Sequence, residues 1–497
     1  MTERVEHHLA RQVAAQPKAP AISDTTGAAW TWSDLAAAAA DMALLLRGEG
    51  VQPGDRVMLV TENCAASVAA MLGGWQMGAV MVPVNARQTA PEIDRVVAHA
   101  EPAAVLFADH VAGDAAAHAD RFQAWKVSGG FGRLRMACPH DSAPDAVQDL
   151  AVILYTTGTT GTPKGVMLTH ANLLFGGRAS CEFRSMSSAD WVYGVLPITH
   201  VFGLASIMVG GMIGGARLSM EARFSPAKLY EALTSGVTLF SGVPQMHAQL
   251  MHYVRERGHD RLGSDSLRYV SSGAAPLDPE WKRQAEAFYG VAIQNGYGMT
   301  ETTAGVAVSR NQIGSLDISC GPLIDGCELR IDETVPGGGD GAGEVVTRGP
   351  NIMRGYYRNP EATAQVLDSE GWLRTGDLGR VDAAGHLHIL GRSKELIIHG
   401  GFNVYPPEVE AALNEHPQVI QCAVIGRPRD GDEEVLAFVM AAAADMPDVA
   451  DLRSFVAARL AGYKRPSKII VATALPAAPT GKILKHKLID QFADWLS

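Results

Sequence analysis

One loop restricts the fold and the ligands of this chain more than any other segment. The apolar residues 150–154 predict a buried strand that leads directly into residues 155–166, where twelve positions hold five threonines, three glycines and one lysine. Glycines let backbone N–H groups turn toward an anion, while hydroxyls and a lysine add donors and positive charge. The loop therefore predicts a phosphate cradle; the alternative is a polar loop between a strand and a helix.

The register of this loop excludes the common P-loop, which would require glycine at Pro163 and serine or threonine at Gly165. The loop instead closely resembles the phosphate-binding signature of the adenylate-forming superfamily of acyl-CoA synthetases, aryl-CoA ligases, luciferases and peptide-synthetase adenylation domains. Further stretches match that superfamily in its order, namely residues 196–200, 295–301, 375–378, 391–398 and 479–484. Six ordered motifs across nearly the whole chain make the resemblance very specific.

Composition sets limits on the class of protein. The 497 residues are 47% hydrophobic and 19% charged, which predicts about three domains with an ample core. The 42 basic and 53 acidic residues give a net charge of −11, which argues against nonspecific nucleic-acid binding. An anionic substrate must therefore be met by local cations.

Cysteines and apolar runs indicate the compartment. The six cysteines show neither a C-x-x-C pair nor zinc-ligand spacing, so we expect free thiols in a reducing compartment. The first residues lack the apolar core of a signal peptide, and we predict a cytoplasmic protein. The longest apolar run, residues 201–216, has five glycines and is shorter than the ~18 residues that suggest a membrane span. We predict a buried core helix there.

Helical and strand patterns alternate along the first part of the chain. Helices are expected at residues 34–47, 65–77 and 90–100, and strands at residues 56–60, 79–82, 103–107, 238–243, 266–272 and 292–297. This alternation predicts an α/β fold with parallel sheets covered by helices. Beyond residue 321, short strands such as 328–332 and 344–348 predict a β-rich subdomain of residues 321–391.

Two glycine-rich segments connect these elements. Residues 127–149 are rich in Gly, Pro, Asp and Ala and predict a connection between layers of the large domain. Residues 337–342 satisfy G-x-G-x-x-A, but no βαβ unit surrounds them, and a hairpin loop explains them better than a dinucleotide site.

A second compact pattern begins near residue 401. It predicts helices at residues 407–414 and 449–460 and strands at residues 419–425, 434–441 and 468–471. These elements suffice for a small α+β domain of about one hundred residues. The resemblance implies domains of residues 1–391 and 392–497, with a hinge at Lys394 about which the small domain moves.

The resemblance also implies a reaction. A carboxylic acid would be activated by ATP to an acyl-adenylate with release of pyrophosphate, and then transferred to CoA with release of AMP. Both first substrates are anions, so the site has to neutralise and align them rather than supply a strong base. ATP, Mg²⁺ and coenzyme A are the expected cofactors.

The resemblance assigns nucleotide contacts to several motifs. The phosphates are assigned to Thr156, Thr157, Gly158, Thr159, Thr160, Gly161 and Lys164. The adenine is assigned to Gly273, Ala274, Ala275 and Tyr297, with Asn295 in the same motif as the tyrosine. Asp377 would accept hydrogen bonds from the ribose hydroxyls and Arg392 would reach the ribose or phosphate. Without the resemblance, these two residues would be interpreted as a turn aspartate and a surface arginine.

Three residues near the nucleotide carry expected roles in the chemistry. Glu301 would hold Mg²⁺ against the phosphates, since that ion prefers oxygen ligands. Thr300 would donate to the α-phosphate, and His200 would stand between the acyl channel and the nucleotide. The alternatives are a solvated glutamate and a structural histidine.

Lys482 follows a Pro-Thr-Gly turn that can hold it at a loop tip. The resemblance implies that it bridges the attacking carboxylate and the phosphate, stabilising charge in the transition state. The alternative is a surface lysine beside a helix, which is our prediction for Lys485 and Lys487.

The acyl channel is predicted to be apolar. The resemblance lines it with Val201, Phe202, Gly203, Gly296, Gly305 and Val306. None of these supplies a cation for a second substrate carboxylate, and Arg223 is the one candidate exception. A medium-chain fatty acid or an aromatic acid is therefore favoured over malonate.

Thioester formation is assigned to the small domain. The resemblance places Gly401 and Asn403 in the loop that lines the pantetheine tunnel, where a missing side chain lets the thin arm pass; an ordinary turn glycine is the alternative. Arg465 lies in a basic segment near the CoA nucleotide. The family often has Gly-Glu here after a loop that may carry an aromatic residue, whereas residues 430–434 read Asp-Gly-Asp-Glu-Glu. This departure leaves CoA docking open.

Three functions remain in competition. The leading hypothesis is an acid–CoA ligase acting on small molecules as a monomer or homodimer. The second is a stand-alone adenylating enzyme that loads the pantetheine of a carrier protein. The third, from another class, is a nonenzymatic acyl-nucleotide sensor.

Overall fold

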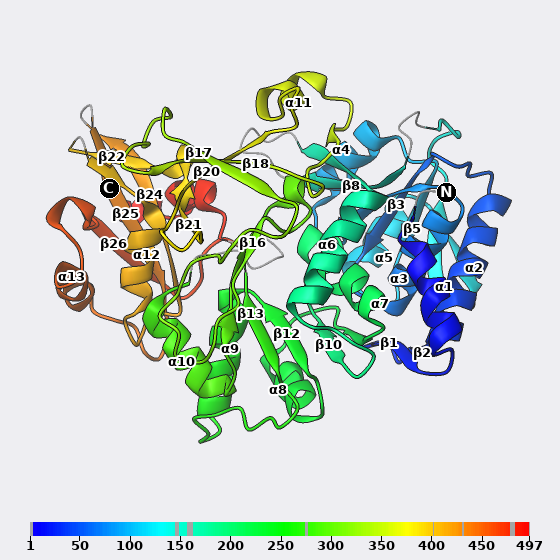
Figure 1. The fold of residues 1–497 in the computed structure, drawn as a ribbon, viewed down its shortest axis with the longest axis horizontal. Helices are drawn as coiled ribbons and strands as arrows, with labels where there is room; N and C mark the ends of the chain where they lie inside the picture. Colours follow the sequence, from blue (N-terminus) through cyan, green and yellow to red (C-terminus); the bar gives the residue numbers. More distant parts are fainter. Residues whose placement is uncertain are drawn as a thin grey trace.

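The computed structural model describes residues 3–144, 149–156, 163–273, 277–400, 402–429, 432–477 and 483–496. Its sheets are flanked by helices, which confirms the α/β class (Figure 1). The N-terminal elements and the C-terminal strands lie at opposite ends of the long axis (Figure 1).

Within the described residues, one sheet has eight strands in the order β19-β9-β8-β4-β3-β5-β7-β6. Its central strands β8, β4, β3 and β5 pair in parallel, and the pairs toward both edges are antiparallel. The prediction of parallel sheets is therefore right for the centre and wrong for the edges. The strands are β3 (Arg56–Thr61), β4 (Val80–Asn85), β5 (Ala104–Phe107), β6 (Trp125–Gly129), β7 (Gly132–Ala137), β8 (Leu150–Thr156), β9 (Lys164–Thr169) and β19 (Gly355–Tyr356).

A second sheet has seven strands within the described residues, in the order β14-β13-β12-β10-β11-β1-β2. Every pair is parallel except β1 with β2. The strands are β1 (Pro20–Asp24), β2 (Ala29–Thr31), β10 (Trp191–Gly194), β11 (Arg217–Met220), β12 (Leu239–Gly242), β13 (Tyr269–Ser272) and β14 (Ile293–Gln294).

Helices cover these sheets and separate them. They are α1 (Glu6–Ala15), α2 (Trp32–Gly48), α3 (Ala65–Gln76), α4 (Ala90–Ala100), α5 (Gly113–Arg121), α6 (His170–Phe183), α7 (Gly210–Gly214), α8 (Pro226–Thr234), α9 (Pro244–Arg255) and α10 (Pro279–Tyr289). One apolar core unites residues of both sheets with α2, α3 and α6.

Helix α3 occupies the centre of this core. It has no polar face, and its residues from Ala65 to Trp75 are all buried, as expected for a helix that is apolar on every side. Trp75 Nε1 donates to the Ala151 carbonyl of β8 at 2.8 Å. A Cβ on Gly73 would lie 2.5 Å from the Ala39 carbonyl oxygen, so this glycine lets α2 pack closely.

Residues 201–216 differ from the single core helix that we predicted. The segment is buried, but it forms a π-helix (Phe202–Val209) followed by the short α7. Ser180 Oγ donates to the Ser206 carbonyl at 2.7 Å, and a side chain that bonds into the backbone ladder in this way favours irregular helical turns. No helix in the described ranges has the length and apolarity needed to cross a bilayer.

Two connections also differ from prediction. Residues 127–149 do not simply join layers, because β6 and β7 form an antiparallel hairpin that extends the eight-stranded sheet. The alternation of buried Val127 and Leu134 with exposed neighbours supports these strands. The threonine-rich loop joins β8 to the antiparallel strand β9. The alternative of a strand-to-helix loop is therefore wrong.

The β-rich subdomain is an antiparallel sheet of β17 (Glu328–Asp332), β18 (Ala342–Arg348), β20 (Leu373–Val381) and β21 (Leu387–Arg392). Residues 337–342 lie in the turn between the antiparallel strands β17 and β18, which confirms the predicted hairpin loop. Helix α11 (Pro360–Val366) lies between β19 and β20 in the chain.

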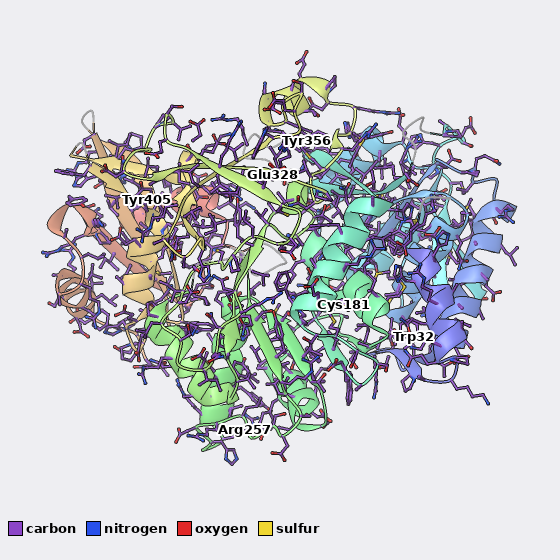
Figure 2. The ribbon with its side chains drawn as sticks, viewed as in Figure 1. Trp32, Cys181, Arg257, Glu328, Tyr356 and Tyr405 are labelled. Atoms are coloured by element: carbon purple, nitrogen blue, oxygen red, sulfur yellow. The ribbon has the colours of Figure 1, made fainter. Side chains whose placement is uncertain are left out.

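The C-terminal part has its own core. Strands β24 (Gln421–Arg429), β25 (Asp432–Met440) and β26 (Lys468–Ala472) form one sheet, and β22 (Ile397–His399) pairs with β23 (Phe402–Val404). Its helices are α12 (Pro406–Asn414), α13 (Val449–Ala457), α14 (Leu488–Gln491) and α15 (Ala493–Leu496). Tyr405 Oη donates to the Gly337 carbonyl at 3.2 Å and so joins this part to the β17–β18 turn. Figure 2 labels Tyr405 on the side of the C-terminal strands.

A buried ion pair stabilises α10. Lys282 Nζ lies 2.8 Å from Glu286 Oε1, with side chains only 2% and 5% exposed. Burial by itself raises the pKa of Glu286, but hydrogen bonds from Lys282, Gly314 and Ile293 outweigh it and leave the pKa below its ordinary value. Such a carboxyl group contributes stability above its unfolded pKa of about 4.3, and this stability is lost as pH falls through the folded pKa.

We predict that Lys282→Met lowers the free energy of unfolding by about 3 kcal/mol at pH 7, because it leaves a buried carboxylate unpaired. The difference from wild type should shrink on acidification, because the unpaired Glu286 is then protonated. Urea unfolding between pH 7 and pH 4 measures both effects. Lys228→Met is the matched control, since Lys228 pairs with Glu221 but is 53% exposed, and it should cost less than about 1 kcal/mol. Equal losses in the two variants would contradict the assignment.

Candidate active site

A tight turn of residues 298–304 presents Glu301. It lies between the paired strands β15 (Gly296–Tyr297) and β16 (Ala307–Val308) and contains a 3₁₀ helix (Thr300–Thr302). A Cβ on Gly298 would lie 2.3 Å from the Ala304 carbonyl oxygen. The turn therefore requires glycine at this position.

The end of this turn is strained. Thr303 and Ala304 have φ values of 49° and 73°, a conformation that costs of order 1–3 kcal/mol for each such residue. Thr303 Oγ1 donates to the Asn351 carbonyl at 2.7 Å, and Asn351 Nδ2 donates to the Gly305 carbonyl at 2.8 Å. Asn351, which the sequence did not single out, thus holds the strained backbone in place.

Tyr356 connects Glu301 to Lys164. Glu301 is buried, and its Oε1 accepts a hydrogen bond of 2.9 Å from Tyr356 Oη. The Lys164 ammonium lies 4.8 Å from the centre of the same tyrosine ring. Burial and then Glu301 raise the pKa of Tyr356, so it remains a donor. Tyr356 was not predicted, because an aromatic in a short strand carries no specific signal.

A second cluster forms around Asp377, on β20. Its Oδ2 accepts a hydrogen bond of 2.6 Å from Tyr297 Oη, and its Oδ1 lies 3.0 Å from Arg392 Nε of β21. Burial, followed by Asp377, raises the pKa of Tyr297 well above its ordinary value. Burial lowers the pKa of Arg392, but Asp377, and more weakly Glu301, help to raise it above its ordinary value. Asp377 therefore joins Tyr297 of β15 to Arg392 of β21.

One residue of the predicted acyl channel, Phe202, packs against Gly273, which was assigned to the adenine. Phe202 begins the π-helix, and a Cβ on Gly273 would lie 2.8 Å from its Cε1. A Cβ on Gly305 would likewise lie 2.8 Å from Ile324 Cδ1. Val201 and Val306 are buried. A Cβ on Gly203 would overlap the Leu196 and Pro197 carbonyls. Gly296 is paired with Val308 between β15 and β16.

His200 and Asn295 have defined places. His200 is exposed, and its Nδ1 accepts a hydrogen bond from Phe202 N at 3.3 Å at the start of the π-helix. Asn295 is buried, and its amide accepts from Gly296 N and donates to the Ser319 carbonyl. These contacts give the Asn295 side chain a structural role; a cofactor contact remains a prediction.

Part of the predicted site lies outside the described residues. These positions are Thr157, Gly158, Thr159, Thr160, Gly161, Ala274, Ala275, Gly401 and Lys482. The described ends of the phosphate loop are Thr156 and Lys164, where the Thr156 hydroxyl donates to the Lys164 carbonyl at 3.5 Å.

Three predicted residues of the C-terminal part are described, and none of them has a described contact with the two clusters. Lys394, in a 3₁₀ helix (Ser393–Glu395), and Asn403, in β23, are both exposed. Arg465 donates from Nε and Nη2 to the Leu460 and Ala457 carbonyls, so it satisfies carbonyls at the end of α13. Lys464 beside it pairs with Glu408 at 2.5 Å.

Lys485 is not the surface lysine that we predicted. Its ammonium lies 2.8 Å from both Glu395 and Glu410, and the side chain is 23% exposed. Two carboxylates outweigh the cost of burial and raise its pKa. Lys485 therefore ties the segment after Lys394 to the C-terminal part.

The acidic segment also has structural contacts. Asp432 accepts from Gly400 N at 3.0 Å, and Glu433 Oε2 accepts from Ile398 N at 2.6 Å. Both carboxylates therefore bind the backbone of the β22–β23 hairpin.

The donor set fits magnesium bound mainly through substrate and water oxygens. Among the described residues, no three His, Cys, Asp or Glu side chains converge on one point. Glu301 is one buried carboxylate, and within the described ranges its Oε2 accepts no hydrogen bond. Mg²⁺ commonly takes one or two carboxylates and completes its shell with phosphates and waters.

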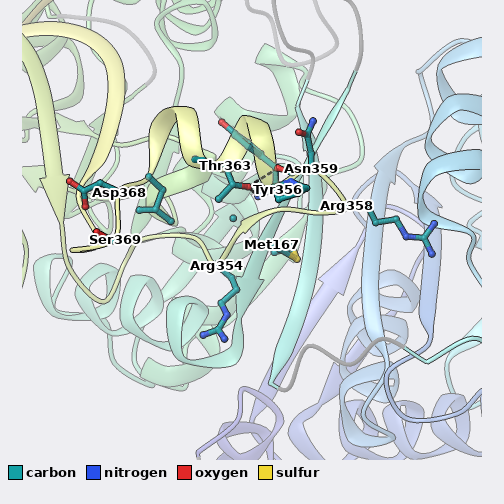
Figure 3. Close-up of a pocket in the computed structure, with 12 residues that line it drawn as sticks. Met167, Arg354, Tyr356, Arg358, Asn359, Thr363, Asp368 and Ser369 are labelled. Atoms are coloured by element: carbon teal, nitrogen blue, oxygen red, sulfur yellow. Dashed lines mark hydrogen bonds between the residues drawn. The ribbon is translucent and has the colours of Figure 1, made fainter.

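A shallow pocket of about 530 Å³ lies behind this cluster, between β9, β19 and α11 (Figure 3). Tyr356 lines it, and its backbone N–H donates to Thr363 Oγ1 at 2.9 Å. The Arg354 and Arg358 side chains extend in different directions (Figure 3), and Arg358 pairs with Glu101. The pocket therefore does not bring two cations together.

Known families account for most of the chain. The family described as "AMP-binding enzyme" matches residues 9–357, and "AMP-binding enzyme C-terminal domain" matches residues 408–482. A feruloyl-CoA synthase from Amycolatopsis sp is 34% identical over 97% of this chain and 98% of that protein. A sulfoacetate–CoA ligase from Cupriavidus necator is 32% identical over 97% and 96%.

A solved structure is similar over its whole length. ATP-bound MatB from Rhodopseudomonas palustris is 30% identical and superposes with a TM-score of 0.82, covering 100% of both chains. The apo form of the same protein gives a TM-score of 0.73 with the same identity and coverage.

We predict that Gly298→Ala lowers the free energy of unfolding by about 1–3 kcal/mol, because its Cβ would overlap backbone atoms that cannot move cheaply. Gly113→Ala is the control, since nothing lies within 4 Å of a Cβ there. It should be neutral or slightly stabilising. Thermal unfolding of both variants tests the packing, and a neutral Gly298→Ala would show that the turn relaxes.

Proposed function

The chain belongs to the AMP-binding enzyme family, and from this premise we propose the reaction that its site performs. It is an AMP-forming acid–CoA ligase, so the alternative of a nonenzymatic sensor is dropped. One observation supports the assignment of the nucleotide site: Asp377 meets Tyr297, 80 residues earlier in the chain, together with Arg392.

In the first half-reaction, a carboxylate oxygen of the acid attacks the α-phosphorus of ATP. A P–O bond forms, the bond to pyrophosphate breaks, and pyrophosphate leaves. Lys164 and Thr300 would bind phosphate oxygens, and Lys482 would bridge the carboxylate and the phosphate. Mg²⁺, when held by Glu301, would neutralise phosphate charge.

We assign the ribose to Asp377 and Arg392. Tyr297 and Arg392 fix the two carboxylate oxygens of Asp377 in place. A carboxylate accepts paired hydrogen bonds of the kind that two adjacent ribose hydroxyls donate. Because Tyr297 Oη is fixed by Asp377, its ring would form a rigid surface for the adenine.

In the second half-reaction, the CoA thiol attacks the acyl carbonyl. A C–S bond forms as the thiol proton is lost to solvent, the C–O bond to AMP breaks, and AMP leaves. We propose that the C-terminal part turns about Lys394 between the steps and that Gly401 and Asn403 then line the pantetheine path. Arg465 has five donors, of which the α13 carbonyls take two, so a contact with CoA phosphate would use the rest.

An aromatic acid is the favoured substrate, with a medium-chain fatty acid next. Phe202 against Gly273 gives the predicted channel an apolar wall. Arg223 is committed elsewhere, since it pairs with Glu62 and with Asp114 at 2.7 Å. The similarity to a feruloyl-CoA synthase points the same way.

Free CoA is favoured over a carrier protein. The carrier alternative arose from the acidic residues 430–434, but Asp432 and Glu433 bind the β22–β23 backbone. Their presence is thus explained without repulsion of CoA. We propose a cytoplasmic enzyme, monomeric or homodimeric, that acts on small molecules.

A panel of acids tests the substrate class. With ATP, Mg²⁺ and free CoA, benzoic, cinnamic and medium-chain fatty acids should release pyrophosphate and give acyl-CoA by mass spectrometry. Malonate and sulfoacetate should react about a hundredfold or more slowly, because their second charge would be buried unpaired. Preference for a dianion would overturn the channel assignment. Activity on a phosphopantetheinylated carrier but not on CoA would overturn the choice of acceptor.

Two substitutions should separate the half-reactions. Lys482→Ala should slow adenylation by about a hundredfold or more, while thioester formation from supplied acyl-adenylate stays within about threefold of wild type. Gly401→Leu should do the reverse, because an isobutyl group would block the pantetheine. Single-turnover kinetics distinguishes them. The exposed Lys487 provides the control, and Lys487→Ala should change neither step. Equal loss of both steps in either variant would contradict the division of roles.

A further inference from the structure

We propose that Tyr356 is a positioning residue for adenylation, which holds the Glu301 carboxylate and the Lys164 ammonium apart and in place. This inference rests on the proposed adenylation function. Neither charged group contacts the other within salt-bridge distance in the described structure, although both contact Tyr356.

The backbone of Tyr356 is fixed from two sides. The residue belongs to β19, where it pairs with Val166 of β9, two positions from Lys164. On the opposite edge its N–H donates to Thr363 Oγ1 of α11 at 2.9 Å. The following residue, Tyr357, donates from its N–H to the Gly165 carbonyl at 2.7 Å. The ring therefore has a defined position relative to the start of β9.

Glu301 is attached to the same segment at two points. Its backbone carbonyl accepts from Met353 N at 2.9 Å, and its Oε1 accepts from Tyr356 Oη at 2.9 Å. A neutral hydroxyl donor leaves the negative charge of the carboxylate in place, whereas a lysine or arginine partner would neutralise it. Oε2 is then oriented without being consumed by an ion pair.

Lys164 is held by a different property of the same side chain. An ammonium 4.8 Å from the ring centre is attracted by the negative face of the aromatic ring. This contact also leaves the charge in place, because the ring has no net charge. If Lys164 and Glu301 paired directly, the carboxylate would be less available to a metal ion and the ammonium would be less available to a phosphate. Tyr356 thus acts as a spacer between opposite charges.

Binding of ATP without a carboxylic acid tests this role, because no turnover takes place. Isothermal titration calorimetry with and without Mg²⁺ compares wild type with Tyr356→Phe, Tyr356→Leu and Glu301→Gln. The matched control is Tyr357→Phe, since Tyr357 is also buried and its ring packs against His99. Thermal unfolding shows which variants remain folded.

Tyr356→Phe keeps the ring and loses the hydroxyl. It should weaken Mg²⁺-dependent ATP binding about tenfold, the value of a hydrogen bond to a charged group, and leave Mg²⁺-free ATP binding within about twofold. Added to Glu301→Gln, Tyr356→Phe should weaken Mg²⁺-dependent ATP binding by less than about a further twofold, because both changes remove the same function. Tyr356→Leu should also weaken Mg²⁺-free ATP binding, by about fivefold, since Lys164 is then no longer held by the ring.

Three outcomes would overturn the proposal. The first is equal weakening with and without Mg²⁺ in Tyr356→Phe, and the second is full additivity with Glu301→Gln. The third is a loss in Tyr357→Phe as large as that in Tyr356→Phe, which would indicate a general packing effect. Wild-type protein that binds no Mg·ATP would overturn the proposed adenylation itself. A wild type that binds Mg·ATP but accepts no tested acid would leave the role of Tyr356 standing and revise only the substrate.

Discussion

The burial of α3 from Ala65 to Trp75 is the constraint on which the rest of the large domain depends. A helix without a polar face has to be covered on every side, and here residues of both sheets and of α2 share one core with it. Trp75 fixes the helix to β8 through its indole N–H. Strand β8 then delivers Thr156, while β13 of the other sheet delivers Gly273. The carboxyl ends of parallel strands are where α/β proteins place their ligands, so this packing determines which loops can share a site.

The chemistry requires cations for anionic substrates in a protein with a net charge of −11. The structure meets this requirement by keeping selected charges from neutralising one another. Lys164 contacts an aromatic face, and Glu301 accepts from a neutral hydroxyl. Elsewhere, opposite charges pair directly, as in Arg223 with Glu62 or Lys485 with Glu395 and Glu410. Lys164 and Glu301 thus keep the charges that the proposed adenylation needs, whereas the pairs of Arg223 and Lys485 stabilise the fold.

Sequence patterns predicted most helices and strands, but they missed the π-helix and two residues of the site. Periodicity and glycine turns located the strands and helices that alternate through the large domain. The π-helix was missed because periodicity cannot register a bond such as that from Ser180 Oγ to the Ser206 carbonyl. The motifs brought Tyr297, Asp377 and Arg392 into one prediction, and they meet. Tyr356 and Asn351 were missed because their importance comes from contacts to residues about fifty positions away, which no local pattern records.

Contacts on either side of Lys394 support its proposed role as the hinge. Arg392 is held by Asp377, in the β-rich subdomain, whereas Glu395 is held by Lys485, in the C-terminal part. Within three residues the chain thus passes from an ion pair with the β-rich subdomain to an ion pair with the C-terminal part. The exposed Lys394 lies between these two ion pairs. The protein superposes better on ATP-bound MatB than on the apo form at equal identity and coverage. The arrangement seen here therefore resembles that of the ATP-bound form more than that of the apo form. A turn about Lys394 would leave both ion pairs intact, whereas it would break the Tyr405–Gly337 hydrogen bond that joins the C-terminal part to the β17–β18 turn.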